Sequence, residues 1–385
     1  MSGPCVLLSA VEASGDALGA ELMRALKRRL GPGTRFVGVG GPLMAREGLK
    51  SAFDIAELSI VGLAEGLTAY PRAARRAEQV ARLAGREQPD VAVLIDSWGF
   101  SYLLARRLRR RRPSLPLVKY VAPQVWATRA GRAKALARTF DLLLSIVAFE
   151  PPIFEGVGAK VAFVGHPALG KDFAKTDPAR LRARIGAAAD DPILLVLPGS
   201  RRSEVERLLP PFEDAVRRLK AERPALQVVI SVAPTVAALV REKTAHWPRV
   251  HLIEGEAARD DAMRAATVAL ACSGTVTTEL AAAGCPMVVA YRLGALTYAV
   301  AKRIVRTRFI TLFNIAAGEA VAPELIQDAA NGPRIAREIA MRLDDIALRA
   351  RQIAAQNAAL DLLGGRGPPP GERAAEAIAD LIKGP

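Results

Sequence analysis

The run Ile193–Leu197 is followed by residues that suit a phosphate-binding loop. Gly199 lets the backbone approach a ligand closely, and Ser200 and Arg201 supply a hydroxyl and a guanidinium. A helical pattern with Glu204 in its first turn comes next, and a helix start presents free N–H groups to an anion. The GK[ST] ending of a Walker loop is absent. The loop alone predicts either a phosphate site or an ordinary tight turn.

A second loop of this kind follows the apolar run Val268–Ala271 and again opens a helical pattern. Its small and polar residues are Ser273, Gly274, Thr275, Thr278 and Glu279. Two small-residue turns at two strand ends can enclose one diphosphate, and Glu279 can accept hydrogen bonds from ribose hydroxyls. The pair of loops therefore predicts a nucleotide site.

Carboxylates follow two apolar runs in the first half of the chain. Asp96 comes directly after Val91–Ile95, where it can act as general base for an acceptor hydroxyl or cap the following helix. Glu12 and Asp16 lie four residues apart at the first strand-to-helix junction. They can bind the acceptor or cap that helix, and both alternatives stay open for each residue.

The elements that must position these residues form two successive series. Continuous apolar runs typical of parallel strands occupy residues 6–10, 36–39, 91–95, 117–121, 142–146 and 161–164, then 193–197, 227–232, 250–253, 268–271 and 287–291. Helical patterns such as 16–30 and 71–86 separate them. We therefore expect an α/β protein with two doubly wound, Rossmann-like domains that face a cleft.

The expected domains are residues 1–170, facing acceptor and membrane, and residues 190–350, binding the donor. A polar, Ala-rich stretch joins them, and a Gly/Pro-rich break at 364–371 precedes a last amphipathic helix over 372–385. That helix is expected to cross to the first domain or to a partner chain. The second alternative would make the protein a homodimer.

Composition narrows the classes of partner. The 385 residues carry a formal charge of +15, which suits a phosphorylated substrate, an anionic membrane or nucleic acid. Aromatic residues make up only 5%, without the aromatic–basic interleaving of nucleic-acid binders, so no nucleic-acid partner is expected. Three scattered cysteines and three scattered histidines show no metal-ligand spacing, so we expect no metal and no cofactor.

Three segments bear on a membrane surface, although no stretch is long and apolar enough to span a bilayer. The segment 58–70, with Val61, Leu63, Leu67 and Tyr70, is either a core helix or an exposed apolar patch. The arginine-rich run 106–112 is a solvated helix end or a surface for anionic lipid headgroups. Residues 293–308 fit an interfacial helix.

An ordered set of short motifs over residues 6–330 resembles the lipid-A-disaccharide synthase family. The motifs of the first half are Glu12-Ala-Ser-Gly-Asp16, Gly40-Gly-Pro42, Val61-Gly-Leu63, Ile95-Asp96, Tyr120-Val-Ala-Pro123 and Val164-Gly-His-Pro167. Those of the second half are Leu197-Pro-Gly-Ser-Arg201, Ser203-Glu-Val205, Ser273-Gly-Thr275, Tyr291-Arg292, Asn314, and Pro323-Glu-Leu325 with Gln327. Each motif is weak alone, but the ordered set is specific.

The resemblance implies a metal-independent glycosyltransferase B fold. The implied reaction is inverting transfer of 2,3-diacylglucosamine from its UDP donor to 2,3-diacylglucosamine 1-phosphate, which gives lipid A disaccharide 1-phosphate and UDP. Asp96 matches the family's proposed base, and Arg201, Glu279, Asn314 and Gln327 fall in or beside donor motifs. The resemblance further implies a cytoplasmic enzyme attached peripherally to the inner membrane of a Gram-negative bacterium, with the region around 61–70 in membrane or acyl contact.

The chain departs from the family's usual residues at several positions. These are Val11, Trp98, Gly99, Thr128, Ala148 and Phe313. Most are in the expected acceptor half, so a divergent lipid glycosyltransferase stays open as an alternative. Another nucleotide-sugar enzyme of the same fold, such as an epimerase, is the other alternative.

Overall fold

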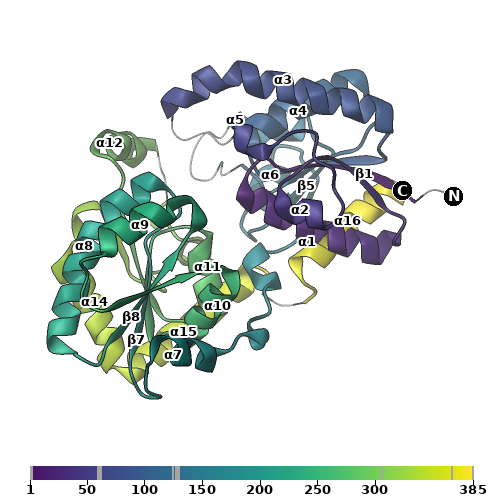
Figure 1. Cartoon of the computed structure of the whole chain (residues 1–385). Coiled ribbons are helices and arrows are strands. Elements are labelled where there is room, and N and C mark those ends of the chain that lie inside the picture. Colours follow the sequence, from purple (N-terminus) through teal and green to yellow (C-terminus); the bar gives the residue numbers. More distant parts are fainter. Residues whose placement is uncertain are drawn as a thin grey trace. The chain divides into compact units, whose positions relative to one another are not determined.

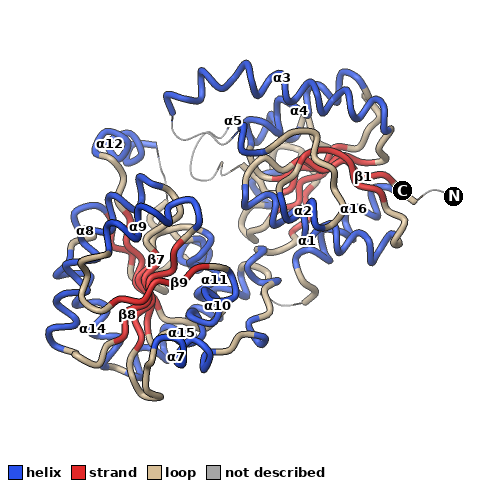
Figure 2. Tube along the Cα trace, viewed as in Figure 1, coloured by secondary structure: helices blue, strands red, loops and turns tan. Residues whose placement is uncertain are grey.

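The computed structural model describes residues 3–58, 63–123, 125, 131–304, 307–365 and 367–383. The chain divides into two compact units, one formed by residues 1–170 with 364–385 and the other by residues 171–363. In each unit helices cover both faces of a central parallel sheet (Figures 1 and 2). The expected α/β class with two doubly wound sheets is confirmed.

In the described part of the first unit, six parallel strands follow the order β2-β1-β3-β4-β5-β6. The strands are β1 (Cys5–Ser9), β2 (Arg35–Val39), β3 (Val91–Ile95), β4 (Leu117–Tyr120), β5 (Leu142–Ser145) and β6 (Val161–Phe163). The helices are α1 (Ala13–Leu30), α2 (Pro42–Arg46), α3 (Leu63–Glu87), α4 (Trp98–Arg111), α5 (Gly131–Ala137), α6 (Pro151–Glu155) and α16 (Pro370–Lys383). The strand order reverses between β1 and β3.

Strand β1 shows why the apolar runs of this sheet are continuous. Leu7 packs into a cluster with residues of α3 and α4 on one face. Val6 and Leu8 point to the other face and pack with residues of α1 and α16. Because both faces are covered, the strand is apolar except at its last residue, the buried Ser9.

The second unit is built in the same way. Over its described residues, the six parallel strands follow the order β12-β11-β10-β7-β8-β9. The strands are β7 (Ile193–Leu197), β8 (Gln227–Val232), β9 (Val250–Glu254), β10 (Val268–Ala271), β11 (Met287–Tyr291) and β12 (Glu324–Ile326). The helices are α7 (Pro178–Ile185), α8 (Arg202–Glu222), α9 (Ala237–Thr244), α10 (Glu256–Ala265), α11 (Thr275–Ala282), α12 (Ala295–Ile304), α13 (Leu312–Ala317), α14 (Gly332–Asp344) and α15 (Ile346–Leu362). Here the strand order reverses between β7 and β10.

The last helix, α16, packs beside α1 although more than 300 residues separate them in the chain (Figure 1). Ala374, Ala375 and Ile378 are buried in the cluster that α1 shares with the sheet. Arg29 on α1 forms an ion pair of 2.8 Å with Glu376 on α16. The C-terminal segment therefore completes the cover of one sheet face of the first unit.

Two elements differ from the expectation. Helix α3 begins at Leu63, eight residues before the predicted start, and contains Pro71 within it. Strand β12 was not predicted, because three residues are too short to show a strand pattern. It pairs in parallel with β11, and Tyr291 lies opposite Ile326. That pairing adds a sixth parallel strand to the sheet, so the carboxyl end of β12 lies at the same edge as the predicted phosphate loops.

Candidate functional site

The two loops predicted to bind phosphate start side by side. Strands β7 and β10 are neighbours, with Ala271 opposite Leu197, and the Cys272 amide donates to the Leu197 carbonyl at 2.9 Å. These strands flank the point where the strand order of the second unit reverses. In open α/β sheets ligands bind beyond the carboxyl ends of the strands at such a point.

The first loop needs glycine at position 199. Its φ is +113°, and a Cβ there would lie 2.6 Å from Oε2 of Glu204. Glu204 is nearly buried and accepts hydrogen bonds from the Arg201 amide at 3.3 Å and from the Arg201 guanidinium at 2.9 Å. Glu204, expected to contact the donor, therefore braces the loop. The Arg201 side chain is 75% exposed at the start of α8.

The second loop exposes Gly274 and Thr275 at the start of α11. Ser273 is half-buried, and its hydroxyl donates to the Ile310 carbonyl at 3.5 Å. Thr278 is fully buried, and its hydroxyl has no hydrogen-bond partner among the described residues. Thr278 was expected to contact the donor directly, but the structure places it beneath the exposed helix start.

Glu279, expected to bind ribose, lies among cations. Its carboxylate is 3.0 Å from the Arg259 guanidinium and 3.5 Å from Nζ of Lys171. Burial alone would lower the pKa of Lys171, but Glu279 and Asp260 hold that pKa above its ordinary value. The carboxylate of Glu279 is thus oriented and largely shielded, with its side chain 18% exposed. A ribose hydroxyl would share Glu279 with these two cations.

Two further predicted donor residues serve to hold the backbone. The side chain of Gln327 accepts from the Leu293 amide at 2.6 Å and donates to the Leu293 carbonyl at 3.2 Å. Asn314 is fully buried and makes the same kind of pair with the backbone of Ala322, at 2.9 and 3.1 Å. Asn314 is therefore buried beneath the site, whereas Gln327 is half-buried and its predicted contact with the donor stays a prediction.

Arginines gather at the same sheet edge. Arg292 follows β11, and its Nε donates to the Gln327 carbonyl at 3.3 Å. Arg207, one turn into α8, was not predicted; a Cβ built at Gly294, in the loop after β11, would lie 3.4 Å from its guanidinium. The available sequence signal was a further arginine, after Arg201 and Arg202, near the start of the helical pattern that follows the loop. With Arg201, these side chains give the edge a positive charge suited to phosphates.

Asp96 occupies the corresponding place in the first unit, directly after β3 at the β1–β3 reversal. Its backbone is in the left-handed region with φ of 49°, as is that of Ser97, the residue that precedes α4. Oδ2 of Asp96 accepts a hydrogen bond of 3.0 Å from the Ser14 hydroxyl on α1. The carboxylate therefore faces α1, and Ser97, not Asp96, occupies the N-cap position of α4.

A buried lysine lies under this turn and was missed from the sequence. Lys119 on β4 is 1% exposed, and its ammonium donates to the carbonyls of Leu94 and Tyr120 at 3.2 Å and to that of Asp96. Burial lowers the pKa of Lys119 to about 7, although Asp96 and Glu12 act in the opposite direction. A lone lysine inside an apolar strand was the signal that could have revealed it.

The two carboxylates after β1 differ in their surroundings. Asp16 is buried and accepts hydrogen bonds from the amides of Gly41, Leu43 and Met44 at 2.8–3.0 Å. It thus caps α2, not its own helix, and its carboxylate is committed to that task. Glu12 is exposed at the N-cap position of α1, near the Asp96 turn.

The predicted membrane segment is only partly described. Val61 lies outside the described residues, and Leu63 and Leu67 lie in the first turns of α3. Tyr70, in the next turn, is 57% exposed. Across the described chain, no helix combines the length and apolar character needed to cross a bilayer.

The positions that depart from the expected pattern also fall into distinct environments. Val11 and Phe313 are buried core residues. The ring of Trp98 stacks on that of Tyr102 with 5.2 Å between the ring centroids, and the Arg132 guanidinium lies over the Trp98 ring. Thr128 lies outside the described residues. Nothing within 4 Å would meet a Cβ at Gly99, so that position is open on the exposed start of α4.

Solved structures with this arrangement define the fold. The S. aureus MnaA–UDP complex matches with a TM-score of 0.65 and 15% identity, covering 99% of this chain and 96% of the other. The glycosyltransferase of kitacinnamycin matches with a TM-score of 0.65 and 17% identity, covering 98% and 99%. The two parallel sheets and these neighbours define a glycosyltransferase B fold.

Closer relatives identify the family. A model of the lipid-A-disaccharide synthetase family matches residues 6–365. The lipid-A-disaccharide synthase of Rhodospirillum centenum is 42% identical over 98% of this chain and 94% of the relative, and that of Ruegeria pomeroyi is 44% identical over 98% and 96%. The chain therefore belongs to the lipid-A-disaccharide synthase family, glycosyltransferases that form the lipid A disaccharide.

Proposed function

We propose that the chain transfers 2,3-diacylglucosamine from a UDP donor to 2,3-diacylglucosamine 1-phosphate with inversion at the anomeric carbon. The products are lipid A disaccharide 1-phosphate and UDP. The main support for this proposal is that, in each unit, the candidate residues lie at the carboxyl ends of the two strands between which the strand order reverses. Asp96 stands at one such point and the loops ending in Arg201 and Thr275 at the other.

The donor would bind to the second unit. The helix starts of α8 and α11 offer amide groups to the diphosphate, and Arg201 and Arg292 add charge-assisted contacts. Glu279 would accept a hydrogen bond from ribose. A solved structural neighbour is a complex with UDP, which supports a uridine nucleotide as the donor's leaving group.

The acceptor would bind to the first unit, with its 6-hydroxyl against Asp96. Asp96 removes the hydroxyl proton as the oxygen attacks the anomeric carbon of the donor. The bond from that carbon to the β-phosphate oxygen breaks, and the leaving UDP takes the electron pair. Arg201 and Arg292 stabilise the negative charge that grows on it. Ser14 orients the base, and Asp16 acts only as a positioning residue through α2.

Replacing Arg201 with alanine is expected to weaken UDP binding by about 10- to 100-fold, because a charge-assisted phosphate contact is lost. Isothermal titration calorimetry with UDP measures this change. Arg202→Ala is the matched control, since Arg202 is as exposed and pairs with Glu206. If the Arg201 variant and the wild type bind UDP with equal affinity, Arg201 does not contact the donor phosphates.

Measuring UDP release from the donor, with and without an acceptor, distinguishes glycosyl transfer from the alternative epimerase activity. A transferase releases UDP in proportion to the acyl-sugar phosphate acceptor, whereas release without any acceptor indicates another nucleotide-sugar reaction. Relatives at 42–44% identity over nearly the whole chain are synthases, and this supports the transferase.

We further propose a cytoplasmic enzyme attached peripherally to the inner membrane through the start of α3. Glutamate at both Val61 and Leu63 is expected to reduce binding to liposomes by tenfold or more, because charged side chains enter an apolar interface unfavourably. Vesicle sedimentation measures the change. Met341→Glu with Ile346→Glu is the control, because both of these apolar side chains are exposed on the second unit. An equal loss in both pairs would contradict the assignment.

A further inference from the structure

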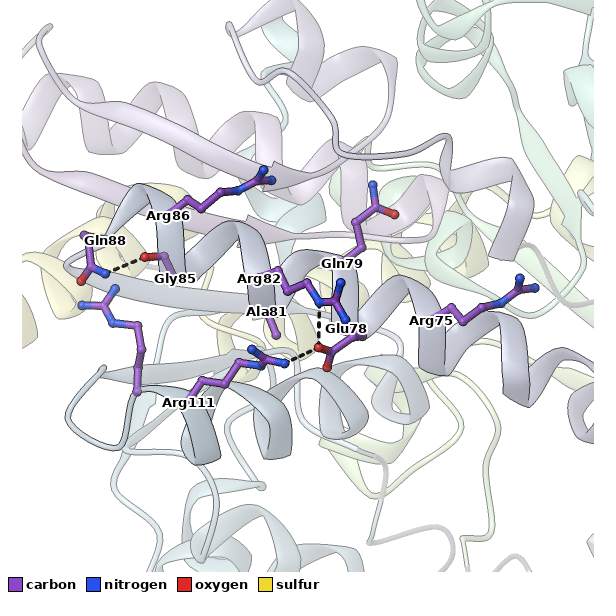
Figure 3. A pocket seen from close by; sticks show the side chains of 10 residues that line it. Arg75, Glu78, Gln79, Ala81, Arg82, Gly85, Arg86, Gln88 and Arg111 are labelled. Carbon is purple, nitrogen blue, oxygen red and sulfur yellow. Dashed lines mark hydrogen bonds and ion pairs between the residues drawn. The ribbon is translucent and has the colours of Figure 1, made fainter.

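Helices α3 and α4 pack together and form an open groove lined mainly by arginines (Figure 3). One part of the groove has a volume of about 810 Å³, and an adjoining part continues along α4 toward Tyr70. The described lining includes the following arginines: Arg75, Arg82, Arg86, Arg106, Arg107, Arg110, Arg111 and Arg112. The reaction proposed above uses none of them.

A single carboxylate, Glu78, holds part of this set in place. Within the described lining it is the one acidic residue, and it lies 3.1 Å from Arg82 and also pairs with Arg111. Figure 3 shows these two guanidiniums converging on Glu78 from α3 and α4. Arg107 adds a third, longer contact of 3.7 Å. One negative charge therefore ties the two helices together and leaves the groove strongly positive.

Three arginines of the groove are available to an outside ligand. Arg75, Arg86 and Arg110 are exposed, and their side chains form no hydrogen bond or ion pair in the part of the chain that the structure describes. Guanidiniums bind phosphate groups with paired hydrogen bonds, so a phosphate-bearing ligand matches the groove in charge and geometry.

The layout of α3 favours a lipid surface over nucleic acid. Its exposed Tyr70 precedes the arginines on the same helix, which places an amphipathic ring beside a basic face, as in interfacial helices. Tyr70 is also the one aromatic side chain in the described lining, so the groove lacks the stacking surfaces that single-stranded nucleic acids use.

We propose that the groove between α3 and α4 binds the phosphate headgroups of anionic membrane lipids. The inference rests on the proposed membrane attachment and adds to it a second, electrostatic contact beside the apolar one. It does not depend on the proposed transfer reaction.

The test compares Arg75→Gln/Arg86→Gln/Arg110→Gln with Arg334→Gln/Arg337→Gln/Arg351→Gln, which removes the same charge from exposed positions on the second unit. Binding is measured at low salt on phosphatidylcholine vesicles with and without roughly one third phosphatidylglycerol. The groove variant is expected to bind the anionic vesicles about 10- to 100-fold more weakly than wild type, and the control within about twofold. Transfer with detergent-dispersed substrates and the melting temperature should match wild type in both variants.

Four results would overturn the inference. Equal losses in both variants would assign the effect to net charge alone. If wild type binds neutral and anionic vesicles equally, headgroup charge does not contribute to membrane binding. Full competition by millimolar glycerol phosphate would indicate a site for a soluble phosphate. Loss of single-stranded DNA binding with unchanged vesicle binding would indicate a nucleic-acid surface. If the groove variant loses vesicle binding but keeps transfer with detergent-dispersed substrates, the result supports the lipid contact and leaves the proposed reaction untouched.

Discussion

Replacing Asp96 with asparagine is expected to lower kcat by about 10²- to 10⁴-fold, the range that a positioned general base contributes. The amide keeps the size of the side chain and can still accept the hydrogen bond from Ser14. The acceptor hydroxyl would lose the group that takes its proton. UDP affinity, measured by calorimetry, should stay within about twofold, because the donor loops belong to the other unit.

The matched control for this prediction is Asp54→Asn. Asp54 is also in the first unit, but it is exposed, and its carboxylate accepts a hydrogen bond from the nearby Ala56 amide. Its replacement should leave kcat unchanged. A comparable loss in both variants, or lost UDP affinity in the Asp96 variant, would contradict the role of Asp96 as the base.

Replacing Lys119 with methionine is expected to lower kcat by about 10- to 100-fold while UDP affinity is preserved. The ammonium holds the Asp96 carbonyl in a turn whose left-handed backbone costs on the order of 1–3 kcal/mol. Without it, three carbonyls lose a buried donor and the turn can relax away from Ser14. Steady-state kinetics with the exposed Lys160→Met as control measures the effect. Unchanged kcat would show that Lys119 only fills the core.

The same lysine predicts how stability depends on pH. The pKa of Lys119 is lowered to about 7 by burial, whereas an unfolded lysine titrates near 10.4. Between these values the unfolded chain binds more protons, so Lys119 makes stability rise with pH across that window and adds no slope below it. Thermal melts from about pH 7 to pH 10 should show the stability of wild type rising relative to Lys119→Met. A constant difference would indicate that the folded pKa is not lowered.

The sheets could be predicted from the sequence because parallel strands covered on both faces leave a simple pattern. Runs such as Ile193–Leu197 are apolar at every position, and the structure confirms them as strands. The start of α3 was predicted too late, because Pro71 and the glycines before it break the helical pattern.

The predicted site residues could be placed at strand ends, but their individual contacts could not be deduced. Glu204, Asn314 and Gln327 have side chains that suit a ligand equally well as a backbone amide or carbonyl. Spacing along the chain cannot separate these partners, because the choice depends on segments that meet only in the folded protein. Asp16 shows the same limit, since it caps a helix that begins 26 residues later.

The most direct test of the proposed function is a mass-spectrometric assay of the purified protein with UDP-2,3-diacylglucosamine and 2,3-diacylglucosamine 1-phosphate. We expect a tetra-acylated β-1,6 disaccharide 1-phosphate and UDP in equal amounts, with loss of both products in Asp96→Asn. UDP released without a disaccharide, or a disaccharide still formed at the wild-type rate by Asp96→Asn, would contradict it.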